Sequence, residues 1–209
     1  MVRLSRVIKN FFQEHFWPIM LVLLFFILGV ALGGLSVDNL RLEQQTDLKN
    51  YLDQNCQVLI NQPLNRTTMV WQTILGNIET AAALWFLGLT VIGLPLVILI
   101  ILIRGFILGF TVAFLIQQNS FQGILLIALG IFPQNLLYVP ALIIGGVLAI
   151  SFSLYLIRGR SSVSSSLWTW LLVYTLSMLL VAVILILAGL IEGLVGPSLL
   201  RILVPLLNS

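Results

Sequence analysis

The chain has 209 residues, of which 60% are hydrophobic and only 8% are charged, with a formal net charge of +3 and one cysteine. Soluble domains carry about a quarter charged residues, so this chain has too little polar surface to cover its apolar side chains in water. The composition therefore excludes a soluble globular enzyme and a disordered chain. Continuous apolar stretches of about 20 residues predict an all-α, polytopic membrane protein, not a β-barrel with alternating strands.

The first predicted span, residues 17–34, follows a basic segment that contains Arg3, Arg6 and Lys9. Positive residues beside a span stay on the cytoplasmic side. The run is longer than a cleaved signal sequence usually has, so we expect an uncleaved anchor with a cytoplasmic N-terminus. We therefore interpret the basic residues as signals that set the orientation of the chain in the membrane, and we expect no nucleic-acid partner.

The long polar stretch at residues 36–80 is predicted to be extracytoplasmic, because the first span leads outward. Leu48, Tyr51 and Leu52 recur there at helical spacing, which predicts an amphipathic helix over about residues 37–60. No other predicted outer surface is of similar size. These three side chains are therefore a candidate partner-binding face, and the grooves between the spans are the other surface that partners could use.

Residues 84–103 are predicted to be the second span, because 20 apolar residues match the thickness of the hydrocarbon core. Arg104 and Gly105 end this run and are predicted to mark its cytoplasmic end. The same Leu-Ile-Arg-Gly sequence recurs at residues 156–159, which predicts a second arrival at that face. If both arginines lie at the cytoplasmic face, the chain between them must cross the membrane an even number of times.

Three apolar blocks fill that interval. We expect residues 105–118 to be a short outward span, residues 121–132 a re-entrant or interfacial helix, and residues 136–157 an inward span. Irregular backbone at membrane depth must be covered by protein. This middle region is therefore expected to be buried in the molecule or in an oligomer. A homo-oligomer, with a dimer favoured, is expected in the lipid bilayer.

The C-terminal part completes a prediction of five transmembrane helices plus one short segment. Residues 158–166 are a predicted cytoplasmic loop, residues 167–187 the last span, and residues 190–209 an outer interfacial tail. Six Lys or Arg residues then lie in inner segments and four in outer ones, in agreement with the positive-inside rule.

The sequence offers no assembled catalytic group. His15 and Cys56, the one histidine and the one cysteine, are predicted on opposite faces, and the common hydrolase, zinc and phosphate-binding motifs are absent. We therefore expect no enzyme activity, cofactor or metal site. Glu79 and Arg104 are interpreted as anchors at the ends of the second span.

Two polar groups interrupt the apolar blocks, one at residues 117–120 and one at Pro133, Gln134 and Asn135. Their amides could satisfy freed backbone groups between helices, or they could be ligands in a small permease or channel subunit. Glycine pairs at a spacing of four, Gly105 with Gly109 above all, are expected to let helices approach closely. Two further pairs have this spacing: Gly29 with Gly33, and Gly189 with Gly193.

The middle of the chain, over about residues 76–158, resembles the stage II sporulation protein M family of endospore-forming bacteria. The residues that carry the resemblance include the site candidates Pro95, Arg104, Gly105, Gly109, Pro133, Gln134, Asn135 and Pro140. The wider superfamily has His, Gly and Glu where this chain has Gln134, Asn135 and Tyr138, so no proton- or metal-linked role is carried over.

The resemblance implies a non-enzymatic membrane scaffold. In this family the protein anchors two peptidoglycan-degrading partners, stage II sporulation proteins D and P, at the sporulation septum. It acts from the mother-cell membrane during engulfment. A scaffold of this kind agrees with the lack of catalytic groups in the sequence.

Overall fold

The computed structural model describes residues 16–41, 43–48, 50, 66–118, 127–157 and 167–207. Within these residues all regular structure is helical, which confirms the all-α prediction. The elements are α2 (Phe16–Asp38), α4 (Arg66–Gly88), α5 (Gly93–Gln118), a π-helix η1 (Ile127–Ile131), α7 (Phe132–Ile157) and α8 (Leu167–Leu207). Among the described helices, α2, α5, α7 and α8 are long and apolar enough to cross a membrane. The chain is a polytopic helical membrane protein.

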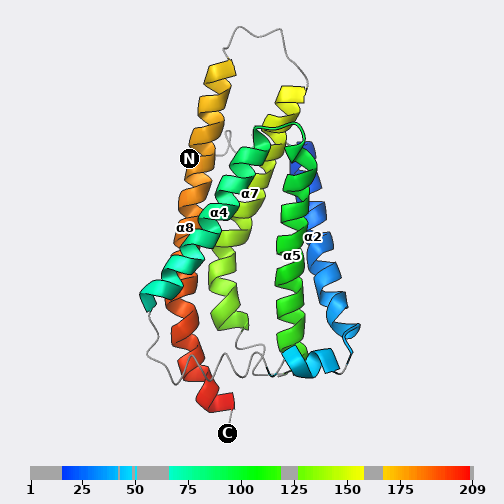
Figure 1. Cartoon of the computed structure of the whole chain (residues 1–209), viewed down its shortest axis with the longest axis vertical. Coiled ribbons are helices and arrows are strands. Elements are labelled where there is room, and N and C mark those ends of the chain that lie inside the picture. The colour runs from blue at the N-terminus through cyan, green and yellow to red at the C-terminus, as the bar shows by residue number, and fades with distance from the viewer. Residues whose placement is uncertain are drawn as a thin grey trace, which may run out of the picture.

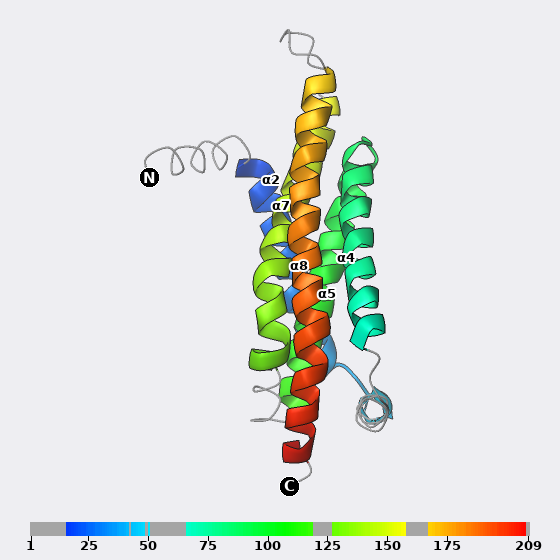
Figure 2. The ribbon, with the colours of Figure 1, turned by 90° about the vertical axis from the view of Figure 1, so that its left-hand side faces the viewer.

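The long helices stand side by side in an up-and-down bundle (Figures 1 and 2). Helices α2, α5 and α8 run in one direction, and α4 and α7 run in the other. The start of α2, the α4–α5 turn and the end of α7 therefore lie at one end of the bundle. The end of α2, the start of α7 and the end of α8 lie at the other.

The predicted second span, residues 84–103, is wrong, because two helices share these residues. Helix α4 ends at Gly88 and α5 begins at Gly93. Pro95 lies in the first turn of α5, where a missing backbone N–H costs nothing. Arg104 is consequently near the middle of α5 and not at the end of a span.

The predicted short span at residues 105–118 is likewise not a separate element, because it is the second half of α5. The predicted polar segment 36–80 is also divided. Residues 43–48 are helical, residues 51–65 lie outside the described part, and residues 66–80 belong to α4. Helix α4 packs along α8 and contacts α7, so residues 66–80 are part of the bundle.

The later boundaries differ as well. Residues 127–131 of the predicted segment 121–132 form η1, which leads directly into α7 and contacts α8. Residues 121–126 lie outside the described residues, and so does the predicted loop 158–166. Helix α7 contains the predicted span 136–157 and begins four residues earlier. The predicted break between the span 167–187 and the tail 190–209 is absent, because α8 continues to Leu207.

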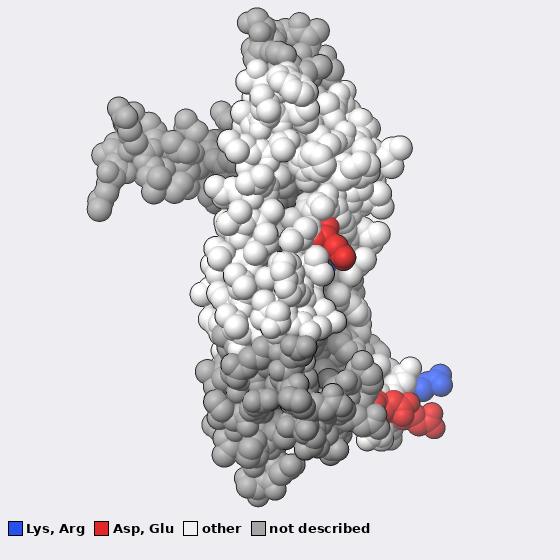
Figure 3. Space-filling view, turned by 60° about the vertical axis from the view of Figure 1, so that its left-hand side comes forward, with Lys and Arg blue, Asp and Glu red and all other residues white. Residues whose placement is uncertain are grey.

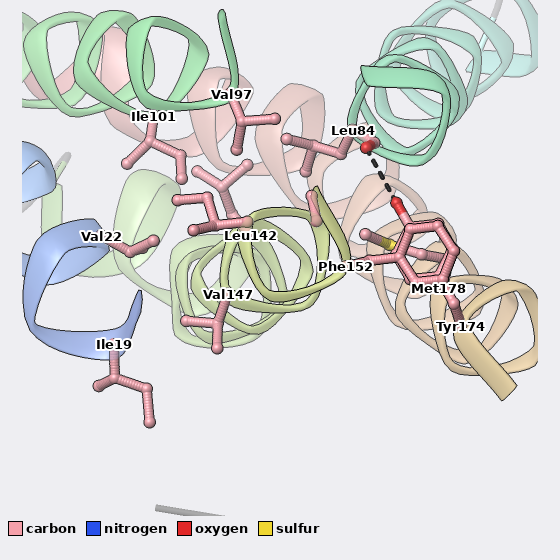
Figure 4. Packing of buried hydrophobic residues seen from close by; sticks show 12 residues of the cluster. Ile19, Val22, Leu84, Val97, Ile101, Leu142, Val147, Phe152, Tyr174 and Met178 are labelled. Carbon is pink, nitrogen blue, oxygen red and sulfur yellow. Dashed lines mark hydrogen bonds between the residues drawn. The ribbon is translucent and has the colours of Figure 1, made fainter. Parts of the chain in front are cut away.

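Helix α7 is the centre of the bundle. Half of its span window is buried, against 17% for α2, 22% for α5 and 28% for α8. Its apolar side chains meet those of the other four long helices in one cluster, shown in Figure 4. The labelled members are Ile19, Val22, Leu84, Val97, Ile101, Leu142, Val147, Phe152, Tyr174 and Met178. Large apolar side chains elsewhere on α2, α5 and α8 are exposed, as expected of surfaces that face lipid.

Helices α2 and α5 make the most extensive contact in the fold, and glycine makes it possible. A Cβ atom built on Gly29 or Gly33 would overlap backbone atoms of α5, and one on Gly105 or Gly109 would overlap backbone atoms of α2. The two glycine pairs therefore face each other across one interface, the close approach typical of small residues in membrane helices. The third pair, Gly189 with Gly193, faces α4 in the same way.

Candidate functional site

A cavity of about 280 Å³ lies between α4, α5, α7 and α8. Its lining includes a cation, a carboxylate, three amides and two hydroxyl groups. These polar residues are Asn77, Arg104, Thr111, Gln134, Asn135, Tyr138 and Glu192. Ionisable side chains within a membrane-spanning bundle are costly and are functional candidates by default.

Arg104 is held by groups from two other helices. Its Nη2 atom donates a hydrogen bond to Oγ1 of Thr80 on α4. Its guanidinium carbon lies 5.5 Å from the ring centroid of Tyr138 on α7, a cation–π arrangement. Thr80 is only 6% exposed and donates its own hydroxyl to the carbonyl of Gly76 at 2.9 Å. The charge thus has a fixed position where α4, α5 and α7 meet.

Three neutral side chains of the cavity each donate one hydrogen bond to a backbone carbonyl. Asn77 Nδ2 donates to the Leu185 carbonyl on α8 at 2.9 Å, which also ties α4 to α8. Asn135 Nδ2 donates to Ile131 O and Thr111 Oγ1 to Ile107 O, both at 2.8 Å. The side-chain oxygens of Asn77, Asn135 and Thr111 can still accept hydrogen bonds in the cavity, and each amide keeps a second N–H donor.

The cavity has a donor end and an acceptor end. Arg104 and Tyr138 lie level with Thr80, in the middle of the bundle. Helix α5 runs from Arg104 toward the end of the bundle where α7 starts, so Thr111 lies two turns nearer that end than Arg104 does. Helix α8 runs in the same direction. Glu192 therefore lies two turns nearer that end than Leu185, whose carbonyl accepts a hydrogen bond from Asn77. The cation is therefore deep, and the carboxylate is nearer that end of the bundle.

The deep end is closed by apolar side chains. Ile101 precedes Arg104 by about one helical turn, and Leu142 follows Tyr138 by one turn. Both are 0% exposed, and Leu84 and Val97 beside them are equally buried. Among the described residues, this apolar cluster separates the cavity from the α4–α5 turn.

The described part of the face drawn in Figure 3 is almost uncharged. In the face drawn in Figure 3, acidic atoms are visible at mid-height on a white surface. The other acidic and basic atoms on this face gather at one end of the molecule. Within the described residues, no group of three or more His, Cys, Asp or Glu side chains could hold a metal ion.

The structure brings together three of the predicted site residues, Arg104, Gln134 and Asn135, which all line the cavity. Gly105 and Gly109 lie instead in the contact with α2. The three prolines belong to the backbone of α5 and α7: Pro95 and Pro133 lie in their first turns, and Pro140 inside α7. Of the predicted partner face, Leu48 is partly exposed, whereas Tyr51 and Leu52 lie outside the described residues.

The prediction that Arg104 marks a cytoplasmic rim is wrong, and Glu192 is part of the cavity, not of an interfacial tail. Sequence reasoning also missed Asn77, Thr80 and Tyr138. One available signal was Pro95, because a proline in the first turn places the start of α5 at Gly93 and hence Arg104 in its interior.

The comparisons with known proteins identify the family. Residues 22–197 match the family described as SpoIIM, Stage II sporulation protein M. Neither the comparison with curated proteins nor that with solved structures found a match. The matched region covers most of the chain and includes the residues on which the resemblance depended. The chain therefore belongs to the Stage II sporulation protein M family.

Proposed function

We propose that the protein is a non-enzymatic membrane scaffold that anchors and localises peptidoglycan-degrading partners at the sporulation septum during engulfment. Family membership makes it a sporulation-related membrane protein. The proposed partners are stage II sporulation proteins D and P, in the mother-cell septal membrane. The scaffold role goes beyond family membership, and the shape of one end of the bundle supports it.

The observation that carries the proposal is the length of α8. Its 41 residues correspond to about 60 Å at 1.5 Å per residue, twice the thickness of a hydrocarbon core. Helix α8 is continuous from Leu167 to Leu207. The segment after α2 lies at the same end (Figure 1). Two elements thus extend where partners that act on the cell wall need a docking surface.

The proposed topology places that end outside the cytoplasm. Arg3, Arg6 and Lys9 precede α2, and Arg158 and Arg160 follow α7. These basic residues are adjacent in sequence to helix ends that lie at the opposite end of the bundle, which the positive-inside rule assigns to the cytoplasm. The C-terminal part of α8 then projects outward from the cytoplasmic membrane.

The glycine interfaces support a rigid anchor. Gly33 and Gly109 bring α2 and α5 to backbone contact, and Gly193 does the same for α8 and α4. Closely packed helices change their relative positions little. Such a body can hold its outer segments at a fixed place.

Co-purification tests this proposal. The protein is isolated from sporulating membranes, and the two hydrolases are quantified beside it. We expect both in the wild-type sample and a large loss when Leu48 and Leu52 are replaced by Asp. Asp47→Asn, an exposed neighbouring substitution, is the matched control and is expected to retain them. Absence of both hydrolases from the wild-type sample contradicts the scaffold.

A homodimer is part of the proposal. The original reason for it, the need to cover a short span, no longer holds because α5 has full length. The exposed apolar side chains on α2, among them Leu24, Ile27 and Leu28, are available to lipid or to a second copy of the chain. Light scattering of the detergent complex, corrected for bound detergent, measures the protein mass; a mass of one chain contradicts the dimer.

One observation supports the rival function, a small permease or channel subunit. Gln134 and Asn135 do line a cavity, together with Arg104. The buried apolar cluster around Ile101 and Leu142 closes that cavity toward the α4–α5 turn. A closed end favours a binding site over a pore, so the scaffold is the better-supported function.

A further inference from the structure

We propose that the cavity between α4, α5, α7 and α8 binds a small zwitterionic solute, an amino acid or a compound of similar size. Its carboxylate is bound at Arg104, and its ammonium group faces Glu192. This site is a further function of the bundle, separate from partner anchoring. It is argued from the chemistry of the two ends of the cavity.

The deep end of the cavity suits a carboxylate. A guanidinium group has five N–H donors in a planar fork that matches carboxylate oxygens. One of these donors is directed to Thr80 Oγ1, and the Tyr138 ring covers one face of the group. The Tyr138 hydroxyl is buried beside the Thr80 side chain, and no hydrogen bond from it to a described residue has the usual distance and angle. It can therefore add a donor to the same carboxylate.

The other end suits an ammonium group. Glu192 supplies a carboxylate, and Asn77, Asn135 and Thr111 each have a side-chain oxygen that can accept a hydrogen bond while the same side chain donates to the backbone. An ammonium group has three donors and no acceptor. The set of acceptors is thus complementary to it.

Charge excludes the simpler ligands. A lone anion at Arg104 would be repelled by Glu192, and a lone cation at Glu192 would be repelled by Arg104. A solute with both charges meets an opposite charge at each end, which is how a site gains both affinity and discrimination. The two side chains together carry no net charge, so the bundle does not have to neutralise an excess charge at membrane depth.

Size and access favour a free solute over a side chain of a partner protein. A water molecule occupies roughly 30 Å³ in the liquid, so the 280 Å³ cavity has room for a solute of amino-acid size. Four helices of the same chain line it, and Ile107 and Thr111 among its lining residues are exposed. A solute needs only the space that is present.

Equilibrium binding to the full-length protein in lipid nanodiscs tests the proposal. The probes are L-alanine, L-serine, propionate, which lacks the amine of alanine, and ethylamine, which lacks its carboxylate. We expect the amino acids to raise the thermal midpoint in a concentration-dependent way, as ligands of the native state do, and the two fragments to have no effect. No stabilisation by either amino acid, or equal stabilisation by propionate, overturns the zwitterion site.

Matched variants locate the site. Glu192→Gln keeps the shape of the side chain and is expected to weaken amino-acid binding about tenfold or more. Glu79→Gln, an exposed acid on α4, is expected to leave affinity unchanged. Thr111→Val removes one acceptor with little change of shape and gives a second test if the Glu192 variant does not fold. Unchanged affinity in the folded Glu192 and Thr111 variants overturns the assignment. Either failure leaves the scaffold unaffected, because that function is measured by partner co-purification.

Discussion

Arg104 on α5 donates a hydrogen bond to Thr80 on α4, although 24 residues separate them in sequence and both lie in the interior of their helices. The bond fixes the depth of the guanidinium at the centre of the bundle. It also explains how a charge is tolerated there, since a hydrogen-bonded and ring-covered group is less costly than a bare one.

Replacing Thr80 by Val should destabilise the bundle by about 1–3 kcal/mol, because it leaves a partly buried charged donor without its acceptor. The free energy of unfolding in mild detergent measures this change. Thr73→Val is the control, because the Thr73 hydroxyl bonds only the Met69 carbonyl of its own helix. Equal stability of the two variants would show that the Arg104 contact contributes nothing.

Gly33→Ala should destabilise the protein by about 1–3 kcal/mol or more, because the added methyl group overlaps the backbone of α5 at Phe106 and Phe110. The neighbouring Gly34→Ala should change stability little, since its Cβ would meet only the Cβ of Ala113 at 4.0 Å. Thermal unfolding of both variants in the same detergent makes the comparison. A Gly33 variant as stable as the Gly34 variant would contradict the close α2–α5 contact.

Tyr174→Phe should cost about 1 kcal/mol. The Tyr174 hydroxyl donates to the Trp85 carbonyl at 3.0 Å, and Leu84 O lies 3.3 Å away, so it serves carbonyls in the last turn of α4. The substitution keeps the ring stacked on Phe152 at a centroid distance of 4.4 Å. Tyr155→Phe is the matched control, and chemical denaturation followed by tryptophan fluorescence gives both values. A loss confined to the control would refute the role of this hydroxyl.

The all-α membrane fold could be predicted from the sequence because its evidence is local. An apolar run long enough to cross a bilayer needs no knowledge of its neighbours, and α2, α7 and α8 were found in this way. The glycine pairs were visible as well, although the sequence could not show that Gly29 and Gly33 face Gly105 and Gly109. That pairing depends on the arrangement of two helices far apart in the chain.

The errors have a common physical origin. A hydropathy window cannot detect the turn between Gly88 and Gly93, because the residues within it, such as Val91 and Ile92, are themselves mostly apolar. Arg104 was assigned to the membrane rim because a lone arginine avoids the interior. Its stabilising partners, Thr80 and Tyr138, come from other helices, and only the folded chain brings them together.

A cysteine pair gives a direct test of the way in which α2 and α5 lie together. The 4.0 Å between an ideal Cβ at position 34 and the Cβ of Ala113 lies within the range that a disulfide requires. In a Cys56→Ser background, Gly34→Cys with Ala113→Cys should therefore form an intramolecular disulfide on mild oxidation, detected by mass spectrometry of alkylated protein. Gly34→Cys with Ile107→Cys is the control pair and should remain reduced, because Ile107 lies almost two turns from Ala113 on α5. Only an intermolecular product from the first pair would mean that α2 contacts another chain at this position, and an equal yield from both pairs would mean that the helices slide past one another.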